Sequence, residues 1–493
     1  FVTRGAAALP VIDGSRMTIR QESQKAVLNW NSFDIETGHR VTFSHPNAAA
    51  ATLNKIGGNA PSVIRGLLES VARDTGGTGG AIYLVNRNGI LFAEGAQVNV
   101  GGLTASALDI ADDVFENGLL STRPGTETIT ADPVFVWGGD DAQHATSLVE
   151  VETGANITTS QDGRVMLLAP KVINAGTIAT PQGQTILAAG DKVYLAAPAS
   201  GSKLRAFLVE VDPGATTSGV ANNLGQITAA RGNITIAALA VNQMGRLSAT
   251  TTVDMNGSIL LQARDTVGPG VAESTATGSS VYNPLAKRMG ALTFGAGSVT
   301  EVTPETGGTR TLRDDQPFEK STIEGSAKTI VLEGATGSVA GARIAAPSGE
   351  VRLTAQGDLS GNADAYGQIR DPDARIYLGE GATVDVAGLR DVGLSVSRNI
   401  IEAELRGNEF KDAPLQRKGI LAGQKVLIDV RKGTPLADVS GYIAGLGRGI
   451  EEKSATGGNV TFNSEGDVIL RQGSVVDVSG GSLNYAGGDV GTT

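Results

Sequence analysis

Short aliphatic runs alternate with glycine-containing corners along most of the chain, and several of these units recur. The run GRVMLLAP at 163–170 returns as GQTILAAG at 183–190, and a second strand pattern, KVINAGTI, lies between the two. Related runs begin at Gly232, Gly349 and Gly458. Each unit reads as glycine, strand, Asn/Ala-Gly turn and strand, with a spacing of roughly 20–25 residues. This period predicts an all-β solenoid, in which each unit forms one coil of a parallel β-helix.

Within a run such as 165–168, one set of alternate side chains is expected to point into the coil and the other outward. Glycine at a corner permits positive φ, and asparagine tolerates it and can stack on its equivalent one coil away. One coil buries about six aliphatic side chains at ~2 kcal/mol each, whereas ordering its backbone costs ~1–2 kcal/mol per residue. Coils are therefore stable only when stacked. A chain of this length would give roughly 15–20 coils, in a rod on the order of 70–100 Å long.

Two stretches interrupt the repeat. Residues 266–320 are polar and rich in Gly, Pro and Thr, which predicts a loop-rich excursion from the solenoid. Residues 400–417 contain the chain's best pattern for a short amphipathic helix, within a charged segment. Excursions on one side of a solenoid are common places for binding surfaces.

Composition agrees with a narrow β-structure. The 67 glycines are about twice the usual share of ~7%, yet 40% of the residues are hydrophobic and only 4% are aromatic. The core must therefore be filled with Val, Ile, Leu and Ala, and the regular aliphatic runs exclude disorder for most of the chain. The absence of cysteine fits either a reducing compartment or a chain that is threaded unfolded through an oxidising one.

Charge and hydropathy limit the classes of partner that the chain is expected to bind. A net charge of −11 argues against nucleic acid, which favours a basic face. No run of 18 apolar residues is present, so no membrane-spanning helix is expected. Phe1 follows no basic and apolar signal region, which is consistent with a mature or trimmed N-terminus.

Candidate catalytic chemistry is sparse. The histidines His39, His45 and His144 have no spacing that suits a metal. The acidic pairs at 112–113 and 140–141 could be acid/base partners, as in polysaccharide-cleaving β-helices, but solvated loop charge explains them more simply. The sequence therefore predicts no catalytic, cofactor-binding or metal site.

The stretch from Gln21 to Ile110 carries a more specific signal. It contains NWNSFDI at 29–35, HPNA at 45–48, NRNGI at 86–90 and GAQVNVGGLTASALDI at 95–110. In this order the four pieces resemble the N-terminal secretion domain of filamentous-haemagglutinin-type exoproteins, the substrates of bacterial two-partner secretion. That family has an N-W-x-x-F-N-I signature, two Asn-Pro-Asn motifs and a G-A-x-V/I-N-x-G-G-L stretch. Here Asp34 replaces an Asn, the first Asn-Pro-Asn motif begins with His45, and Arg87 replaces the proline of the second.

The resemblance covers roughly residues 8–265 and implies a right-handed parallel β-helix with an N-terminal cap. The cluster of Trp30, Phe33 and Phe43 is the best candidate for the core of that cap. The expected organisation is a two-partner-secretion domain over 1–265, the excursion over 266–320, and a continued β-helix shaft over 321–493 with the helical excursion near 400–417.

The resemblance also implies a function. The chain would be the N-terminal part of a secreted adhesin, not an enzyme. It is expected to be a monomeric fragment that crosses the periplasm to reach the cell surface. Its partner would be a dedicated outer-membrane β-barrel transporter with periplasmic POTRA-type domains, and its eventual ligand a surface glycan or protein. Candidate recognition residues are Asn29, Trp30, Phe33, Pro46, Asn47, Asn86, Asn88, Gly89 and Ile90. For Asn86 and Asn88, a tight turn held by side-chain hydrogen bonds is the simpler interpretation. The delivery end of a contact-dependent toxin and a polysaccharide-active β-helix enzyme are the alternatives.

Overall fold

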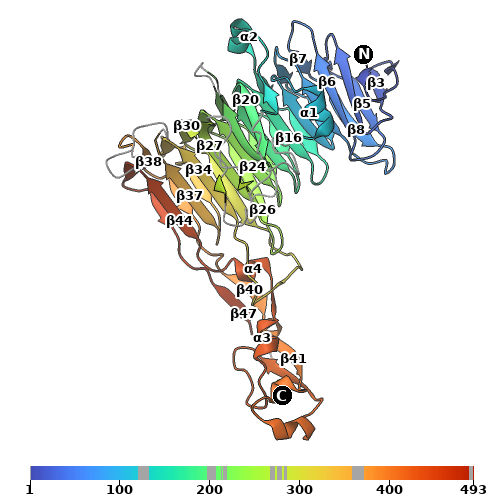
Figure 1. Cartoon of the computed structure of the whole chain (residues 1–493). Coiled ribbons are helices and arrows are strands. Elements are labelled where there is room, and N and C mark those ends of the chain that lie inside the picture. The colour runs from blue at the N-terminus through green and yellow to red at the C-terminus, as the bar shows by residue number, and fades with distance from the viewer. Residues whose placement is uncertain are drawn as a thin grey trace.

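The chain winds into a β-helix whose coils each contribute one strand to three long sheets (Figure 1). The computed structural model describes residues 2–119, 133–196, 207–212, 214, 219–266, 273–274, 280–281, 286–357, 371–487 and 492. Apart from the antiparallel pairs β1/β4, β2/β3 and β27/β30, neighbouring strands of these sheets come from successive coils and run parallel, as in the trio β16, β19 and β24. The predicted fold class, an all-β parallel β-helix, is confirmed.

The first sheet has 13 strands, with β30 paired to β27 beside the main path. They are β1 (Val2–Arg4), β4 (Lys25–Trp30), β6 (Ala51–Ile56), β9 (Ala81–Val85), β12 (Gly102–Ser106), β16 (Arg164–Ala169), β19 (Gln184–Ala189), β24 (Asn233–Ala238), β27 (Ser258–Thr266), β30 (Ala286–Met289), β34 (Thr322–Ala327), β37 (Glu350–Ala355) and β44 (Asn459–Ser464).

The second sheet has 10 strands. They are β7 (Ser62–Ile64), β10 (Ile90–Phe92), β14 (Val149–Val151), β17 (Lys171–Asn174), β22 (Val220–Asn223), β25 (Ala240–Gln243), β31 (Ala291–Phe294), β35 (Thr329–Leu332), β38 (Arg375–Leu378) and β45 (Asp467–Leu470).

The third sheet has 13 strands. They are β2 (Val11–Asp13), β3 (Arg16–Arg20), β5 (Arg40–His45), β8 (Leu67–Ala72), β11 (Gln97–Val100), β15 (Asn156–Thr159), β18 (Thr177–Ala179), β23 (Gln226–Ala229), β26 (Arg246–Thr251), β32 (Val299–Pro304), β36 (Arg343–Ala345), β39 (Thr383–Asp385) and β46 (Val475–Asp477).

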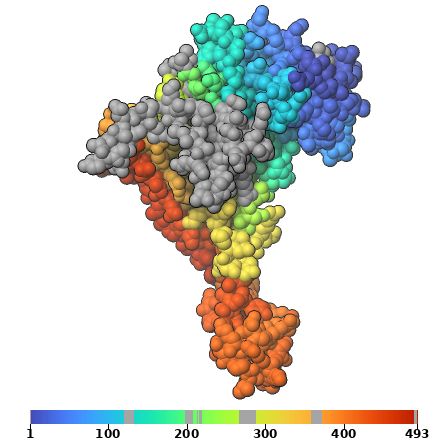
Figure 2. Space-filling model, viewed as in Figure 1, coloured from blue at the N-terminus to red at the C-terminus, as the bar shows by residue number. Residues whose placement is uncertain are grey.

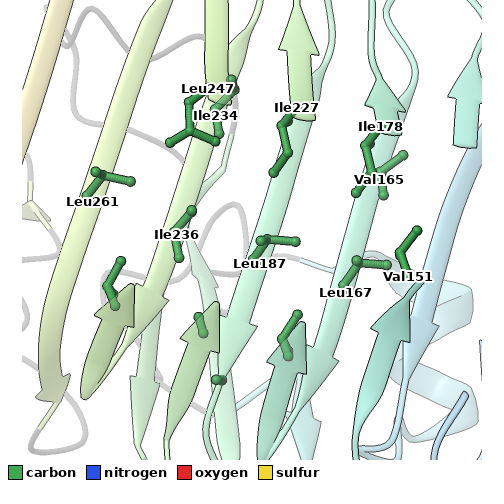
Figure 3. Packing of buried hydrophobic residues seen from close by; sticks show 14 of the residues in the cluster. Val151, Val165, Leu167, Ile178, Leu187, Ile227, Ile234, Ile236, Leu247 and Leu261 are labelled. Atoms are coloured by element: carbon green, nitrogen blue, oxygen red, sulfur yellow. The ribbon is translucent and has the colours of Figure 1, made fainter. Parts of the chain in front are cut away.

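The solenoid core is a stack of aliphatic side chains that point inward from all three sheets. Val165 and Leu167 of β16 lie in register with Thr185 and Leu187 of β19, and both leucines are fully buried. Figure 3 shows these rows continuing through Ile234, Ile236 and Leu261. The glycine-bounded aliphatic runs of the sequence therefore form the coils that they predict.

A buried polar ladder accompanies this core. Asn174, Asn223 and Gln243 occupy the same register position at the ends of β17, β22 and β25. Nδ2 of Asn174 donates to Oδ1 of Asn223 (2.8 Å), and Nδ2 of Asn223 donates to Oε1 of Gln243 (2.7 Å). All three side chains are buried, so corner amides do stack from coil to coil, as expected from the sequence.

Antiparallel strands cap the N-terminal end of the solenoid. β1 pairs antiparallel with β4, and β2 pairs antiparallel with β3. Beneath them the ring of Phe33 packs edge-on against Trp30 (5.4 Å between centroids) and stacks with Phe43 (6.3 Å). Phe33 and Phe43 are buried and Trp30 is half-buried. The predicted aromatic cluster therefore lies within the capped first coils.

The opposite end of the shaft is open. Val468, Leu470 and Val476 in the last coil are in register with Ile376, Leu378 and Val384, which are fully buried one coil earlier. In the last coil the exposed fractions of these side chains are 43%, 53% and 37%. The inward face of that coil is thus exposed because no further coil covers it within the described residues.

A second, antiparallel layer covers part of the first sheet. It consists of β13 (Phe135–Val136), β20 (Lys192–Ala196) and β21 (Leu208–Asp212), with helix α1 (Asp112–Asn117) beside it. These elements form a hydrophobic cluster with outward-facing residues of the first sheet, including Met166, Leu168, Ile186 and Ala188. Both faces of β16 and β19 are therefore buried. Alternate side chains do point inward and outward as expected, but in these strands the covering layer buries the outward set.

A lobe spanning residues 392–453 leaves the shaft between β39 and β44 (Figures 1 and 2). It contains β40 (Val392–Ser395), η1 (Val396–Asn399), β41 (Ile400–Glu404), η2 (Asn408–Phe410), η3 (Pro414–Lys418), β42 (Lys425–Asp429), α3 (Ser440–Ala444), β43 (Gly447–Arg448) and α4 (Ile450–Lys453). β40 pairs with β47 (Leu483–Ala486), and the lobe has its own core around Ala403, Leu405 and Phe410.

The helix predicted near 400–417 is instead a strand followed by two 3-10 turns. β41 forms an antiparallel hairpin with β42, and Ala403 and Leu405 are buried at the two-residue spacing of a strand. Val426 and Ile428 of β42 are buried against them. The segment forms a strand despite its helical pattern, because packing against β42 stabilises its apolar residues more than an isolated helix would.

The excursion predicted over 266–320 is smaller than expected. β31 and β32 fall inside this range and belong to the second and third sheets, paired with β25 and β26. The segments at 267–272, 275–279 and 282–285 lie outside the described residues. β28 (Glu273–Ser274) pairs with β29 (Ser280–Val281), and β33 (Leu312–Arg313) pairs with β43 of the lobe.

The shaft also has fewer coils than the length suggested. Eleven successive parallel strands, β4 to β44, mark its coils in the described part of the first sheet. The estimate of 15–20 coils was too high, because it assumed that every residue lies in a coil. The covering layer and the lobe use much of the remaining sequence.

Candidate functional site

The two most specific sequence motifs meet at one corner of the solenoid. Four neighbouring strands of the first sheet end on the same side of that sheet: β4, β6, β9 and β12. The residues around these ends surround a cavity of about 420 Å³, which we call the corner pocket. Its lining residues are Asn29, Trp30, Asn31, Lys55, Ile56, Gly57, Val85, Arg87, Ala107, Asp109 and Gly138. Asn29 and Trp30 of the first motif thus share a pocket with Arg87 of the second.

Trp30 links this pocket to the core. Its Nε1 donates a 2.9 Å hydrogen bond to Oδ1 of Asn54 in the next coil, and Nδ2 of Asn54 donates to the carbonyl oxygen of Tyr83 (3.1 Å). Asn54 is fully buried, whereas Asn29 is exposed. Of the first motif, Phe33 packs into the cap core, Trp30 fixes the pocket wall, and Asn29 is accessible to a partner.

Asn86 holds the second motif in a tight turn. Its Nδ2 donates to the carbonyl oxygen of Ala60 and to Oγ of Ser62, both at 3.0 Å. Its Oδ1 accepts from the backbone N–H of Asn88 (3.0 Å), and Nδ2 of Asn88 donates to the carbonyl oxygen of Gly58 (2.7 Å). Asn86 is fully buried. These asparagines therefore build the corner, as the turn interpretation predicts, and Asn86 is inaccessible to a partner.

Gly89 and Ile90 complete this turn. Gly89 has φ +103°, and a Cβ at this position would lie 2.5 Å from the carbonyl oxygen of Leu148. Ile90 is buried at the start of β10, between Ser62 and Val149 in the second sheet. Only glycine fits the first position without strain, and the second is a core residue.

Pro46 and Asn47 lie at a different corner, between β5 and β6, and do not line the corner pocket. Oδ1 of Asn47 accepts a 3.0 Å hydrogen bond from the backbone of Ala49. The neighbouring His45 is fully buried, with Nε2 2.8 Å from Oγ1 of Thr52. Burial lowers the pKa of His45 to about 4, opposed in part by its contact with the carbonyl oxygen of Gly79. The structure therefore separates this motif from the other two.

Charged residues fasten helix α1 next to the corner pocket. Nζ of Lys55 lies 3.3 Å from Asp109 and 2.8 Å from Asp112. Lys25 donates to the carbonyl oxygens of Phe115 (2.7 Å) and Glu116 (2.9 Å) near the end of α1. Burial against this helix lowers the pKa of the Lys25 ammonium. Asp109 belongs to the 95–110 motif, but nothing in the sequence singled out Lys55 or showed that the two meet, because they are brought together only by the coil register.

The acidic pairs considered for acid/base chemistry have structural roles in part. Asp112 pairs with Lys55 and with Arg4 (3.5 Å). Asp140 caps helix α2 (Asp141–Thr146), since its Oδ1 accepts from the backbone N–H of Gln143 (2.8 Å).

Two surveys of the described residues gave no further site. Across the ranges given above, no group of three or more His, Asp or Glu side chains could hold a metal ion. No helix in that part of the chain is long and apolar enough to cross a membrane.

The family profile of the TPS secretion domain matches residues 5–281, which is more than half of the chain. The chain belongs to the TPS secretion domain family. The match includes the cap, the corner pocket and the covering layer, so the two-partner-secretion resemblance of the sequence is confirmed.

Two curated relatives are similar to part of the chain. A heme/hemopexin-binding protein of Haemophilus influenzae strain Rd is 30% identical over 261 residues, covering 51% of this chain and 26% of the relative. A heme/hemopexin-binding protein of Haemophilus influenzae is 39% identical over 107 residues, covering 22% of this chain and 11% of the relative. The chain thus spans about a quarter or less of these relatives' length.

A solved structure extends the comparison to the whole chain. The HMW1 secretion domain from Haemophilus influenzae matches with a TM-score of 0.59 and 21% identity, covering 98% of this chain and 99% of that one. At this identity the match shows the fold. As a TPS secretion domain, the chain is part of an exported protein, and the family implies a dedicated outer-membrane transporter as its partner.

Proposed function

We propose that this TPS domain directs export of a secreted, filamentous-haemagglutinin-like adhesin, and that the corner pocket is where the transporter's periplasmic domains recognise it. The chain crosses the periplasm, passes through the transporter barrel and folds at the cell surface. The name of the two relatives describes ligand binding, which supports a binding protein over an enzyme.

The observation that carries this proposal is the shared position of the two motifs. Asn29 and Arg87 are both exposed, belong to different coils and line one pocket, although 58 positions separate them in the sequence. Asn86, Asn88 and Gly89 are needed to form the turn that presents Arg87. Beneath the pocket, Asn54 of the intervening coil connects these two coils, because it accepts from Trp30 and donates to the carbonyl oxygen of Tyr83. This division supports a role in recognition for the exposed pair and a role in folding for the buried residues.

A secretion assay tests the proposal. The chain is co-expressed with the transporter encoded beside it, and exported and periplasmic protein are quantified. The double substitution Asn29→Ala/Arg87→Ala should reduce export about tenfold or more, while the purified variant keeps the circular dichroism spectrum and unfolding midpoint of the parent. Asn99→Ala/Arg65→Ala is the matched control, because it removes an exposed Asn and an exposed Arg outside the pocket.

Normal export of Asn29→Ala/Arg87→Ala would overturn the pocket assignment. Deletion of residues 21–43, which removes the first motif and a cap strand, should abolish export. Normal export of this deletion would overturn the role of the whole region. Binding of the purified chain to the isolated periplasmic domains separates loss of recognition from loss of translocation.

A further inference from the structure

The end of the lobe combines exposed aliphatic side chains with unpaired cations. Leu415 and Ile420 have exposed fractions of 91% and 89%, the two highest among the large hydrophobic residues of the described chain. Arg417 and Lys418 lie between them and are also exposed. The 3-10 turn η3 begins at Pro414, and Leu415 adds nothing to the lobe core, which Phe410 fills from the preceding turn.

Local charge is opposite in sign to that of the whole chain. Residues 406–425 contain five basic and two acidic side chains, whereas the chain has a net charge of −11. Three of these cations, Arg406, Lys411 and Lys425, form ion pairs with Glu404, Asp438 and Glu402. Arg417 and Lys418 form no ion pair with any residue that the structure describes. Their charge is therefore available to an external anion.

The position of this segment favours contact with a large object. Figures 1 and 2 show the lobe projecting from the C-terminal part of the shaft, with short helical turns at its far end. We define residues 414–420 as the tip. The hairpin of β41 and β42 and the separate core of the lobe support this tip, so it is held away from the solenoid surface.

We propose that the tip binds anionic membrane surfaces, with Leu415 and Ile420 inserting at the headgroup level and Arg417 and Lys418 pairing with lipid phosphates. Amphipathic segments with aliphatic residues beside Lys and Arg are suited to this interface. A protein partner fits less well, because a stable protein interface buries about 800 Å² per side, more than seven residues provide. The proposal concerns a different surface from the corner pocket and does not depend on export.

Vesicle co-sedimentation of the purified full chain tests this proposal. Vesicles of phosphatidylcholine mixed with phosphatidylglycerol should bind the chain, and vesicles of phosphatidylcholine alone should bind it far more weakly. Binding to the anionic vesicles should fall as salt is raised, because screening weakens attraction between exposed charges. The substitution Arg417→Gln/Lys418→Gln should weaken binding about 25-fold, from roughly a fivefold contribution per cation.

Two further variants separate insertion from charge. Leu415→Ser/Ile420→Ser should lose binding while keeping the net charge, and Gln416→Ala, an exposed change on the same turn, should bind like the parent. Because all these side chains are exposed, the variants should fold normally, which circular dichroism verifies. Equal binding by the parent and both double variants would overturn the proposal. So would equal binding to the two vesicle types, or a tip-dependent dimer without vesicle binding, which would assign the tip to a second copy of the chain.

Discussion

Nδ2 of Asn88 donates a 2.7 Å hydrogen bond to the carbonyl oxygen of Gly58, one coil earlier in the solenoid. This bond joins the motif turn at 86–90 to the chain segment that follows β6. Asn86 makes the parallel connections to Ala60 and Ser62. The motif thus connects successive coils. Its two asparagines are expected to contribute unequally to the stability of the fold.

Asn86→Ala should destabilise the chain more than Asn88→Ala. The first substitution removes a fully buried amide and leaves the buried Oγ of Ser62 without this partner, at about 1–3 kcal/mol for an unpaired buried group. Asn88 is only half-buried, so water can replace its side chain at a cost of about 1 kcal/mol. Urea unfolding of both purified variants measures the difference. An equal or reversed order would show that the Asn86 contacts do not hold the turn.

Gly89→Ala should cost about 2–4 kcal/mol of unfolding free energy. The new Cβ would meet the Leu148 carbonyl oxygen at 2.5 Å, and φ of +103° adds backbone strain. Gly95→Ala is the control, because Gly95 also has positive φ (+86°) but open space around its Cβ position. It should cost only about 1 kcal/mol. Similar thermal unfolding shifts for the two variants would mean that the close approach to Leu148 contributes nothing.

Acidification should destabilise the region around His45. Its pKa is about 4 in the folded chain against an ordinary value of 6.5, so between these pH values the unfolded chain binds a proton that the folded chain excludes. Stability is therefore unaffected by His45 above about pH 7 and falls as the pH drops from 6.5 toward 4, by about 3 kcal/mol in total.

The variant His45→Gln should flatten this part of the pH profile, whereas His39→Gln, at an exposed site, should leave it unchanged. Amide hydrogen exchange in β5 and β6 as a function of pH provides the measurement. An unaltered acid dependence in His45→Gln would assign the effect to carboxylates elsewhere.

Asn223→Ala should destabilise the solenoid by about 2–4 kcal/mol, because it removes the middle of the buried ladder and leaves amide groups of Asn174 and Gln243 unpaired. The neighbouring Asn222 accepts a similar 2.8 Å bond from Asn242 but is only half-buried. Asn222→Ala should therefore cost about 1 kcal/mol. Denaturant midpoints of the two adjacent variants give the comparison, and a larger loss for Asn222→Ala would contradict it.

The repeating part of the fold could be predicted because its information is local. A glycine precedes the strand that contains Val165 and Leu167, and another precedes the strand that contains Leu187, so glycines mark the corners. Each coil then repeats the same contacts with its neighbours. The aromatic cluster of Trp30 and Phe33 was predictable for the same reason, since both residues lie within one short motif.

The covering layer could not be predicted in the same way. Met166 and Leu168 are apolar at outward positions, and this was the one local signal that something buries them. Their partners Val193, Leu195 and Val209 come from a hairpin that leaves the coil and folds back over it. The pairing is a tertiary contact that no period in the sequence encodes.

The sequence predicted individual residues of the corner pocket but not that they lie together. Asn29, Trp30 and the 86–90 motif were found individually, but their convergence depends on the coil register that places Trp30 beside Asn54 and Arg87 at the same edge. Lys55 was missed because an isolated Lys carries no pattern, and Asp109, although it lies in the 95–110 motif, was not recognised as its partner. Pro46 and Asn47 matched a motif of the same kind yet lie at another corner.

The two ends of the described shaft differ in strand direction and in burial. Antiparallel strands close the side that begins with β1 and β2, so no strand can be added there in the same sense. At β44–β46 the backbone edge and the uncovered Val468, Leu470 and Val476 form a template for one more parallel turn. Within the described residues the parallel stacking of coils therefore proceeds in one direction only, away from the antiparallel cap.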